Sequence, residues 1–150
     1  MQAEFLETGG LRGAFTTGDQ VTIKVELEFL SSLKHPALSL LLQDRKMIPL
    51  SGQYLKLAKA DQEQGLTRRT IIFSFEASLT EGTYFLTLRL EDRQTENNFF
   101  PIDKQIGILS LEVLPSSGKT FMGIVDLKIN CFESHIQEQK ENFNKNPIKK

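Results

Sequence analysis

Residues 20–29 read QVTIKVELEF, and this stretch decides the fold class of the chain. Its apolar and polar side chains alternate without a break: Val21, Ile23, Val25, Leu27 and Phe29 are separated by Thr22, Lys24, Glu26 and Glu28. Successive side chains of a β-strand point to opposite faces, so a period of two predicts a strand with one dry face and one wet face. We therefore expect this segment to belong to a sheet that covers a core.

Similar segments recur along the chain at short intervals, separated by turn residues. We predict strands at residues 3–7, 20–29, 37–44, 67–76, 84–91, 106–114 and 122–129, with a less regular one inside residues 47–57. Proline lacks a backbone N–H, so Pro49 favours an edge position for that last strand. The pattern favours an all-β sandwich or barrel of about eight strands over an alternation of strands and helices.

One turn carries a more specific signal. Residues 79–84 read LTEGTY, which places Tyr84 two residues after the turn glycine Gly82, at the start of a strand. This arrangement resembles the tyrosine corner of Greek-key sandwiches, in which the tyrosine hydroxyl donates a hydrogen bond to the connecting backbone. We predict such a corner at Tyr84; the alternative is an ordinary core tyrosine.

Length and charge set further limits. The 150 residues suffice for one domain, and we expect residues 1–132 to form it and the polar residues 133–150 to form a flexible tail. The 18 lysines and arginines nearly balance the 19 acidic residues, so no global field attracts nucleic acid or an anionic membrane. Without a signal peptide or an apolar span, and with Cys131 alone, the sequence predicts a cytoplasmic protein that does not insert into membranes.

The motifs that suggest catalysis fail on inspection. Residues 116–120, SSGKT, look like the end of a phosphate-binding loop, but that loop needs a glycine where Val113 stands, and it needs a helix to follow. Neither His35 nor His135 has metal ligands at a suitable spacing, and Cys131 lacks a catalytic partner. The carboxylates of Asp44, Glu91 and Asp92 are interpreted as solvated turn acids. We predict a protein that is not an enzyme and needs neither metal nor cofactor.

One sheet face combines apolar and hydrogen-bonding groups. If the fold is immunoglobulin-like, Leu41, Phe85 and Ile108 point away from the core, and their neighbours are Ser39, Gln43, Thr87, Arg89 and Ser110. Apolar groups with a polar rim form binding surfaces. Coverage of this face by another element or by a partner subunit is an equal alternative.

The order of these signals resembles a known family, the C-terminal domain of the ATPase subunit (Wzt) of bacterial O-antigen and related polysaccharide ABC exporters. The resemblance rests on the following pieces, in order: Phe15-Thr16-Thr17-Gly18-Asp19 before an alternating strand, Pro36 before residues 37–44, residues 79–84 before residues 86–92, and the closing GIVDL of residues 123–127. It implies an immunoglobulin-like antiparallel β-sandwich that recognises the finished glycan on the cytoplasmic side, beside the transporter ATPase and permease. It also implies a homodimer that exchanges C-terminal strands.

Two departures from the family pattern are clear. The ATPase domain that normally precedes this domain is absent from the chain, and tryptophan, the most effective sugar-stacking side chain, is absent too. Tyr54, Phe85, Phe99 and Phe100 are therefore the candidate stacking platforms.

From these pieces we predict a non-catalytic module that binds a cell-surface polysaccharide of the O-antigen type. The alternative is a protein–protein assembly domain without glycan binding. The candidate carbohydrate-binding residues are Ser39, Leu41, Gln43, Tyr54, Phe85, Thr87, Arg89 and Ile108.

Overall fold

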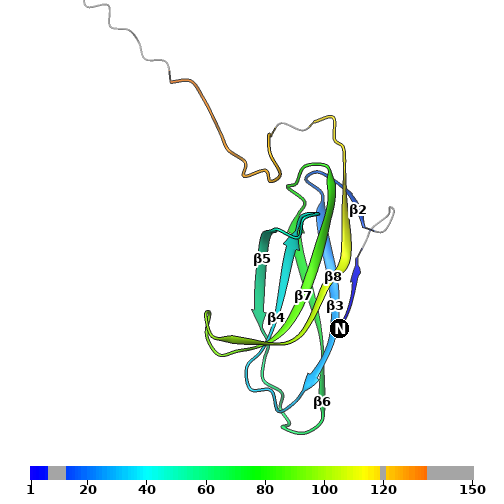
Figure 1. The fold of residues 1–150 in the computed structure, drawn as a ribbon, viewed down its shortest axis with the longest axis vertical. Coiled ribbons are helices and arrows are strands. Elements are labelled where there is room, and N and C mark those ends of the chain that lie inside the picture. Colours follow the sequence, from blue (N-terminus) through cyan, green and yellow to red (C-terminus); the bar gives the residue numbers. More distant parts are fainter. Residues whose placement is uncertain (7–12, 119–120, 135–150) are drawn as a thin grey trace, which may run out of the picture.

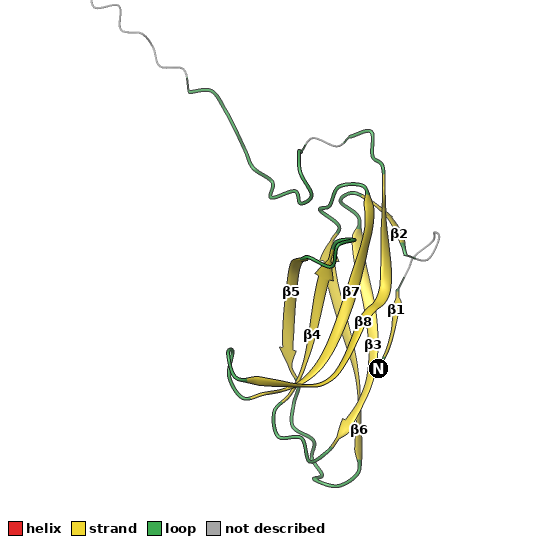
Figure 2. Cartoon of the chain, viewed as in Figure 1, coloured by secondary structure: helices red, strands yellow, loops and turns green. Residues whose placement is uncertain are grey.

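The structure is a computed structural model that describes residues 1–6, 13–118 and 121–134. Eight strands make up the fold: β1 (Gln2–Phe5), β2 (Ala14–Thr16), β3 (Gln20–Leu30), β4 (Pro36–Gln43), β5 (Pro49–Lys56), β6 (Leu66–Glu76), β7 (Gly82–Arg93) and β8 (Phe99–Leu114). The described residues contain no helix, as Figure 2 shows, and hence none that is long and apolar enough to cross a bilayer.

The strands form two facing sheets. One has three strands in the order β1-β3-β6, and the other has five in the order β2-β8-β7-β4-β5 (Figure 1). All pairs are antiparallel except the short parallel pair of β2 with β8. This architecture confirms the predicted immunoglobulin-like β-sandwich of about eight strands. The edge position of β5 confirms the prediction made from Pro49.

The alternating residues of β3 form one wall of the core. Val21, Ile23, Val25, Leu27 and Phe29 are at most 3% exposed, and the register of β3 with β6 runs without a break from Gln20 to Leu30. The opposite wall comes from the five-stranded sheet, with these buried residues: Leu38, Leu40, Leu42, Tyr84, Leu86, Leu88, Leu90, Leu111 and Val113. Full burial of each large apolar side chain stabilises the fold by about 1.5–3 kcal/mol, so this dry interface holds the sheets together.

The prediction of a strand at residues 122–129 is wrong. The segment makes one isolated bridge, between Leu79 and Val125, and the eighth strand is instead β2. Lys128 still contacts the sandwich, with its Nζ 2.7 Å from Glu76 Oε1. Beyond it the chain extends away (Figure 1), and Ile129 is 81% exposed. Alternation alone does not make a strand, because a strand also needs a neighbour with a free edge. Most of the predicted tail, residues 135–150, lies outside the described residues.

The β7–β8 hairpin is longer than predicted and bent. The register of the two strands shifts between Leu86 and Leu88 and again between Leu90 and Glu91. At the first shift Gly107 has a φ of +63°, a conformation that glycine adopts without steric cost, and its N–H donates to Thr87 Oγ1 at 3.2 Å. The outer half of the hairpin swings away from the sandwich (Figure 1) and returns Phe99 to the level of Arg93.

Tyr84 forms the predicted corner. Its hydroxyl donates to the Thr80 carbonyl oxygen at 2.7 Å, and the side chain is 3% exposed. Burial, together with the nearby charge of Asp44, raises the pKa of this phenol. The hydrogen bond fixes the turn before β7, the strand that supplies most of the site described below.

Replacement of Tyr84 by phenylalanine should lower the free energy of unfolding by about 1–2 kcal/mol, because a part-buried hydrogen bond is removed without a change of ring. Urea unfolding of both proteins measures the difference. The only other tyrosine, Tyr54, provides the matched control, and Tyr54→Phe should change the stability by less than about 0.5 kcal/mol. Equal losses in the two variants would show that the corner does not contribute as described.

Candidate functional site

The outer face of the five-stranded sheet carries a continuous row of polar side chains. Ser39 of β4 pairs with Tyr54 of β5 on one side and with Arg89 of β7 on the other. Arg89 in turn pairs with Lys104 of β8. Because paired residues in a sheet point to the same face, these four side chains cross the sheet side by side.

Next to this row lies a fully buried carboxylate, Glu91. Its Oε1 accepts hydrogen bonds from Ser39 Oγ at 2.6 Å and from Arg89 Nε, and its Oε2 accepts from Arg93 Nε at 2.8 Å. A buried carboxylate without such partners would cost several kcal/mol. The two guanidinium groups are therefore required by Glu91, and they leave the cluster with one net positive charge.

The pKa of Glu91 reflects two opposing effects. Burial alone raises it, because the charged form loses its hydration. Hydrogen bonds from Arg93, Ser39 and Arg89, together with the charge of Arg89, outweigh burial and hold the pKa of Glu91 below its usual value. Glu91 is therefore ionised at neutral pH, and the interpretation of this residue as a solvated turn acid is wrong.

Two aromatic rings enclose the guanidinium of Arg93. Its Cζ lies 4.0 Å from the ring centroid of Tyr54 and 4.1 Å from that of Phe99, so the cation is stacked between β5 and the bent hairpin. Arg89 also approaches the Phe99 ring, at 4.8 Å. Cation–π contacts of this kind stabilise by about 0.5–2 kcal/mol each. They hold the rings at fixed positions at the rim of the sheet face.

A surface cavity of about 330 Å³ opens over this row. Its lining residues are Ser39, Leu40, Leu41, Gly52, Gln53, Tyr54, Thr87, Arg89, Arg93 and Lys104. Five of the eight candidate residues lie among them. Gly52 is required at its position, because a Cβ there would come within 2.9 Å of the Leu40 carbonyl oxygen.

The other candidates are placed differently. Gln43 and Phe85 pair with each other further along the same face. Gln43 Oε1 accepts from the hydroxyl of Thr87, which is only 3% exposed, so these two residues support the face from beneath. Ile108 does not join the group. It packs against the core and lines a separate cavity with Met1 and Ala3, because the bulge at Gly107 turns it away from Phe85.

Sequence reasoning missed Glu91, Arg93 and Lys104 as members of the site. Arg89, Glu91 and Arg93 are spaced two residues apart, so a single strand places all three on one face with alternating charge. That spacing was an available signal for the ion-pair cluster. Among the proposed platforms, Tyr54 and Phe99 meet at Arg93, whereas Phe100 is 63% exposed on the opposite side of β8.

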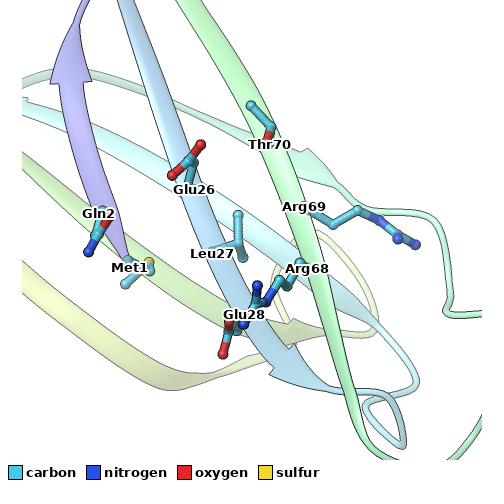
Figure 3. A pocket seen from close by; sticks show the side chains of 8 residues that line it. All are labelled: Met1, Gln2, Glu26, Leu27, Glu28, Arg68, Arg69 and Thr70. Carbon is cyan, nitrogen blue, oxygen red and sulfur yellow. Dashed lines mark ion pairs between the residues drawn. The ribbon is translucent and has the colours of Figure 1, made fainter.

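A larger cavity, of about 540 Å³, lies on the three-stranded sheet beside the N-terminus (Figure 3). Both of its arginines already have partners: Arg68 Nε lies 2.5 Å from Glu28 Oε1, and Arg69 donates to the Ala58 carbonyl oxygen. Its lining residues include no aromatic ring. This cavity therefore offers less to a ligand than the face above β4 and β7.

Within the described residues, no three side chains of His, Cys, Asp or Glu are grouped so that they could hold a metal ion. Cys131 is exposed on the extended segment. His135 and residues 119 and 120 of the SSGKT stretch lie outside the described residues.

Fold and face together define an immunoglobulin-like β-sandwich domain with a polar, aromatic-rimmed sheet surface. The family described as "Wzt C-terminal domain" matches residues 1–127, and the chain belongs to this family. The family is associated with polysaccharide ABC exporters, in which it forms a C-terminal domain outside the ATPase domain of the transporter subunit.

Solved structures agree with the fold. The chain is similar to the crystal structure of the C-terminal domain of Wzt, with a TM-score of 0.68 and 17% sequence identity. The likeness covers 88% of this chain and 81% of that one. None of the curated proteins compared with the chain matches it.

Replacement of Glu91 by glutamine should lower the free energy of unfolding by about 3 kcal/mol, because two guanidinium groups lose their countercharge in a buried setting. Urea unfolding at neutral pH measures it. Glu28→Gln, which removes a carboxylate from the exposed pair with Arg68, is the control and should cost less than about 1 kcal/mol. A loss at Glu91 no larger than at Glu28 would contradict the assigned role.

The pH dependence of the same variant tests the charge of Glu91. Its pKa is lower in the folded than in the unfolded chain, so its contribution to stability is complete above about pH 4.3, the ordinary glutamate value, and is lost as the pH falls through the folded pKa. The stability difference between the unmodified protein and Glu91→Gln should therefore shrink on acidification. A difference that stays constant would indicate that Glu91 is not ionised.

Proposed function

We propose that this domain is a non-catalytic carbohydrate-binding module that recognises a cell-surface polysaccharide of the O-antigen type for export by an ABC transporter. The carrying observation is the cavity over β4, β5, β7 and β8, in a chain that belongs to a family associated with polysaccharide export. Its lining combines the Tyr54 ring with guanidinium and ammonium donors, and the Phe99 ring contacts both lining arginines. Sugars offer apolar ring faces and many hydroxyl acceptors, so such a surface suits them.

In this proposal a sugar ring lies against Tyr54 at the rim, and Arg89 and Lys104 donate hydrogen bonds to its oxygens. Ser39, Gln43 and Thr87 hold that layer in place from below, while Leu41 and Phe85 extend the face for neighbouring sugar units. The domain then acts on the cytoplasmic side, beside the transporter ATPase and permease. No bond is made or broken.

A single shallow site of this kind binds weakly, and a homodimer would compensate. Two sites that grip one repetitive polymer gain effective concentration, by about 10²-fold or more where the spacing fits. We propose that the dimer forms by exchange of the C-terminal segment. An apolar groove of about 400 Å³ between β5 and β6 supports this, lined in part by Leu50, Phe73, Phe75, Val125 and Leu127.

The chain after Leu127 carries large apolar side chains that suit this apolar groove. Ile129 and Phe132 are 81% and 90% exposed in a single extended chain, which is costly for large apolar side chains. β5 and β6 are the outermost strands of their sheets on this side. The same segment from a second copy would bury its apolar residues in the groove and pair with an open edge.

Binding is tested with polysaccharide purified from cells that produce the protein, titrated calorimetrically. Tyr54→Ala should weaken binding at least about tenfold, because a central aromatic contact is removed. Phe100→Ala, which removes an exposed ring from the opposite side of β8, is the control and should bind as the unmodified protein does. If the folded protein binds no polysaccharide, the proposed function fails.

Removal of residues 128–150 should convert a dimer into a monomer, whereas removal of residues 135–150 alone should leave the dimer intact. Light scattering after size exclusion gives the mass of each species. A full chain that is monomeric at micromolar concentrations, or a dimer that survives the longer deletion, would rule out exchange of this segment.

A further inference from the structure

The cavity over β4, β5, β7 and β8 has more positively than negatively charged side chains. Arg89, Arg93 and Lys104 line it, and none of the lining residues is aspartate or glutamate. Glu91 beneath the floor neutralises one of the three charges, and its oxygens already accept three hydrogen bonds. Two positive charges are therefore left without a countercharge at the cavity.

The strand register places two of these positive charges side by side. Arg89 and Lys104 lie directly opposite each other on neighbouring strands, an arrangement that destabilises a sheet when both residues carry the same charge. Among the described residues no acid forms an ion pair with Lys104. Its chain neighbour Asp103 faces the opposite side of β8 by alternation, and its carboxylate accepts from Gln105 at 3.5 Å.

The neighbouring row adds charge of the same sign. Lys56 of β5 pairs with Ala37, which pairs with Glu91, so Lys56 lies on the same outer face. The opposite sheet is arranged differently: Lys24 lies 3.1 Å from Glu26, and Arg68 lies 2.5 Å from Glu28. Lys24 and Arg68 of that sheet thus each have a carboxylate partner, whereas Lys104 of this face forms no ion pair with a described acid.

We propose that the polysaccharide bound here is acidic, and that a carboxylate or phosphate group on its sugars lies between Arg89 and Lys104. This inference rests on the proposed function and adds the chemical class of the glycan. Arg89 presents a planar guanidinium, held in place through its Nε by Glu91, that suits a carboxylate or phosphate oxygen pair. Lys104 adds a mobile ammonium on the other side. Arg93, which is only 6% exposed, acts as a positioning residue for the two rings.

Calorimetric titration of the folded protein with three forms of the same polysaccharide tests the inference: native, carboxyl-reduced and dephosphorylated. An acidic ligand predicts binding of the native form that weakens at least about tenfold after one of the two treatments, and that treatment identifies the anion as carboxylate or phosphate. Lys104→Gln should weaken binding of the native form about fivefold and binding of the neutralised form by a smaller factor, because glutamine keeps a hydrogen-bond donor but not the charge. Binding of the native form should also weaken as salt is added.

The control is Lys24→Gln, which removes one positive charge from the opposite sheet and should leave affinity unchanged. Equal binding of all three forms, or equal effects of the two lysine variants, would overturn the acidic assignment while leaving glycan binding in place. Absence of binding to every form by a protein that unfolds cooperatively would overturn glycan binding itself, and the acidic assignment with it.

Discussion

A carboxylate with no exposed surface, Glu91, is the constraint on which the binding face depends. Burial of that charge requires Ser39, Arg89 and Arg93 as partners, and each comes from a fixed position on β4 or β7. Arg93 then fixes the rings of Tyr54 and Phe99, which joins the edge strand β5 to the bent end of the hairpin. A rigid aromatic rim thus follows from one buried charge, and rigidity lowers the entropy that a ligand must offset on binding.

The fold could be predicted because its inner faces follow a strict period of two. The alternating apolar residues of β3, from Val21 to Phe29, all reach the core, and the turn at Gly82 was sufficient to place the corner at Tyr84. These features depend on local pattern and on burial, which one sequence reveals. Residues 122–129 show the limit of this reasoning, because a strand-like composition does not reveal whether a segment pairs along its length, and this one makes only the Leu79–Val125 bridge.

Only part of the site could be predicted from the sequence, for physical reasons that differ from residue to residue. Ile108 does not lie on the outer face because the irregularity at Gly107 interrupts the pairing of β8 with β7, and such an irregularity depends on the partner strand as much as on its own residues. Glu91 was misread because the solvation of a carboxylate depends on what the neighbouring strands place beside it. Lys104 belongs to the site because it pairs with Arg89, fifteen residues earlier in the chain. The bent hairpin determines that pairing, and the sequence alone does not show it.

The two outer faces of the sandwich show how one fold separates stability from recognition. On the three-stranded sheet, Lys24 and Arg68 are neutralised by Glu26 and Glu28, so that face has little to gain from a charged ligand. On the five-stranded sheet, the Glu91 carboxylate is surrounded by an excess of cations, and the positive charge that it does not neutralise faces water. Because exposed like charges cost a sheet only fractions of a kcal/mol, the core can tolerate this imbalance. A polymer that supplied the missing anions would then be held by a surface whose positions were already set for the sake of Glu91.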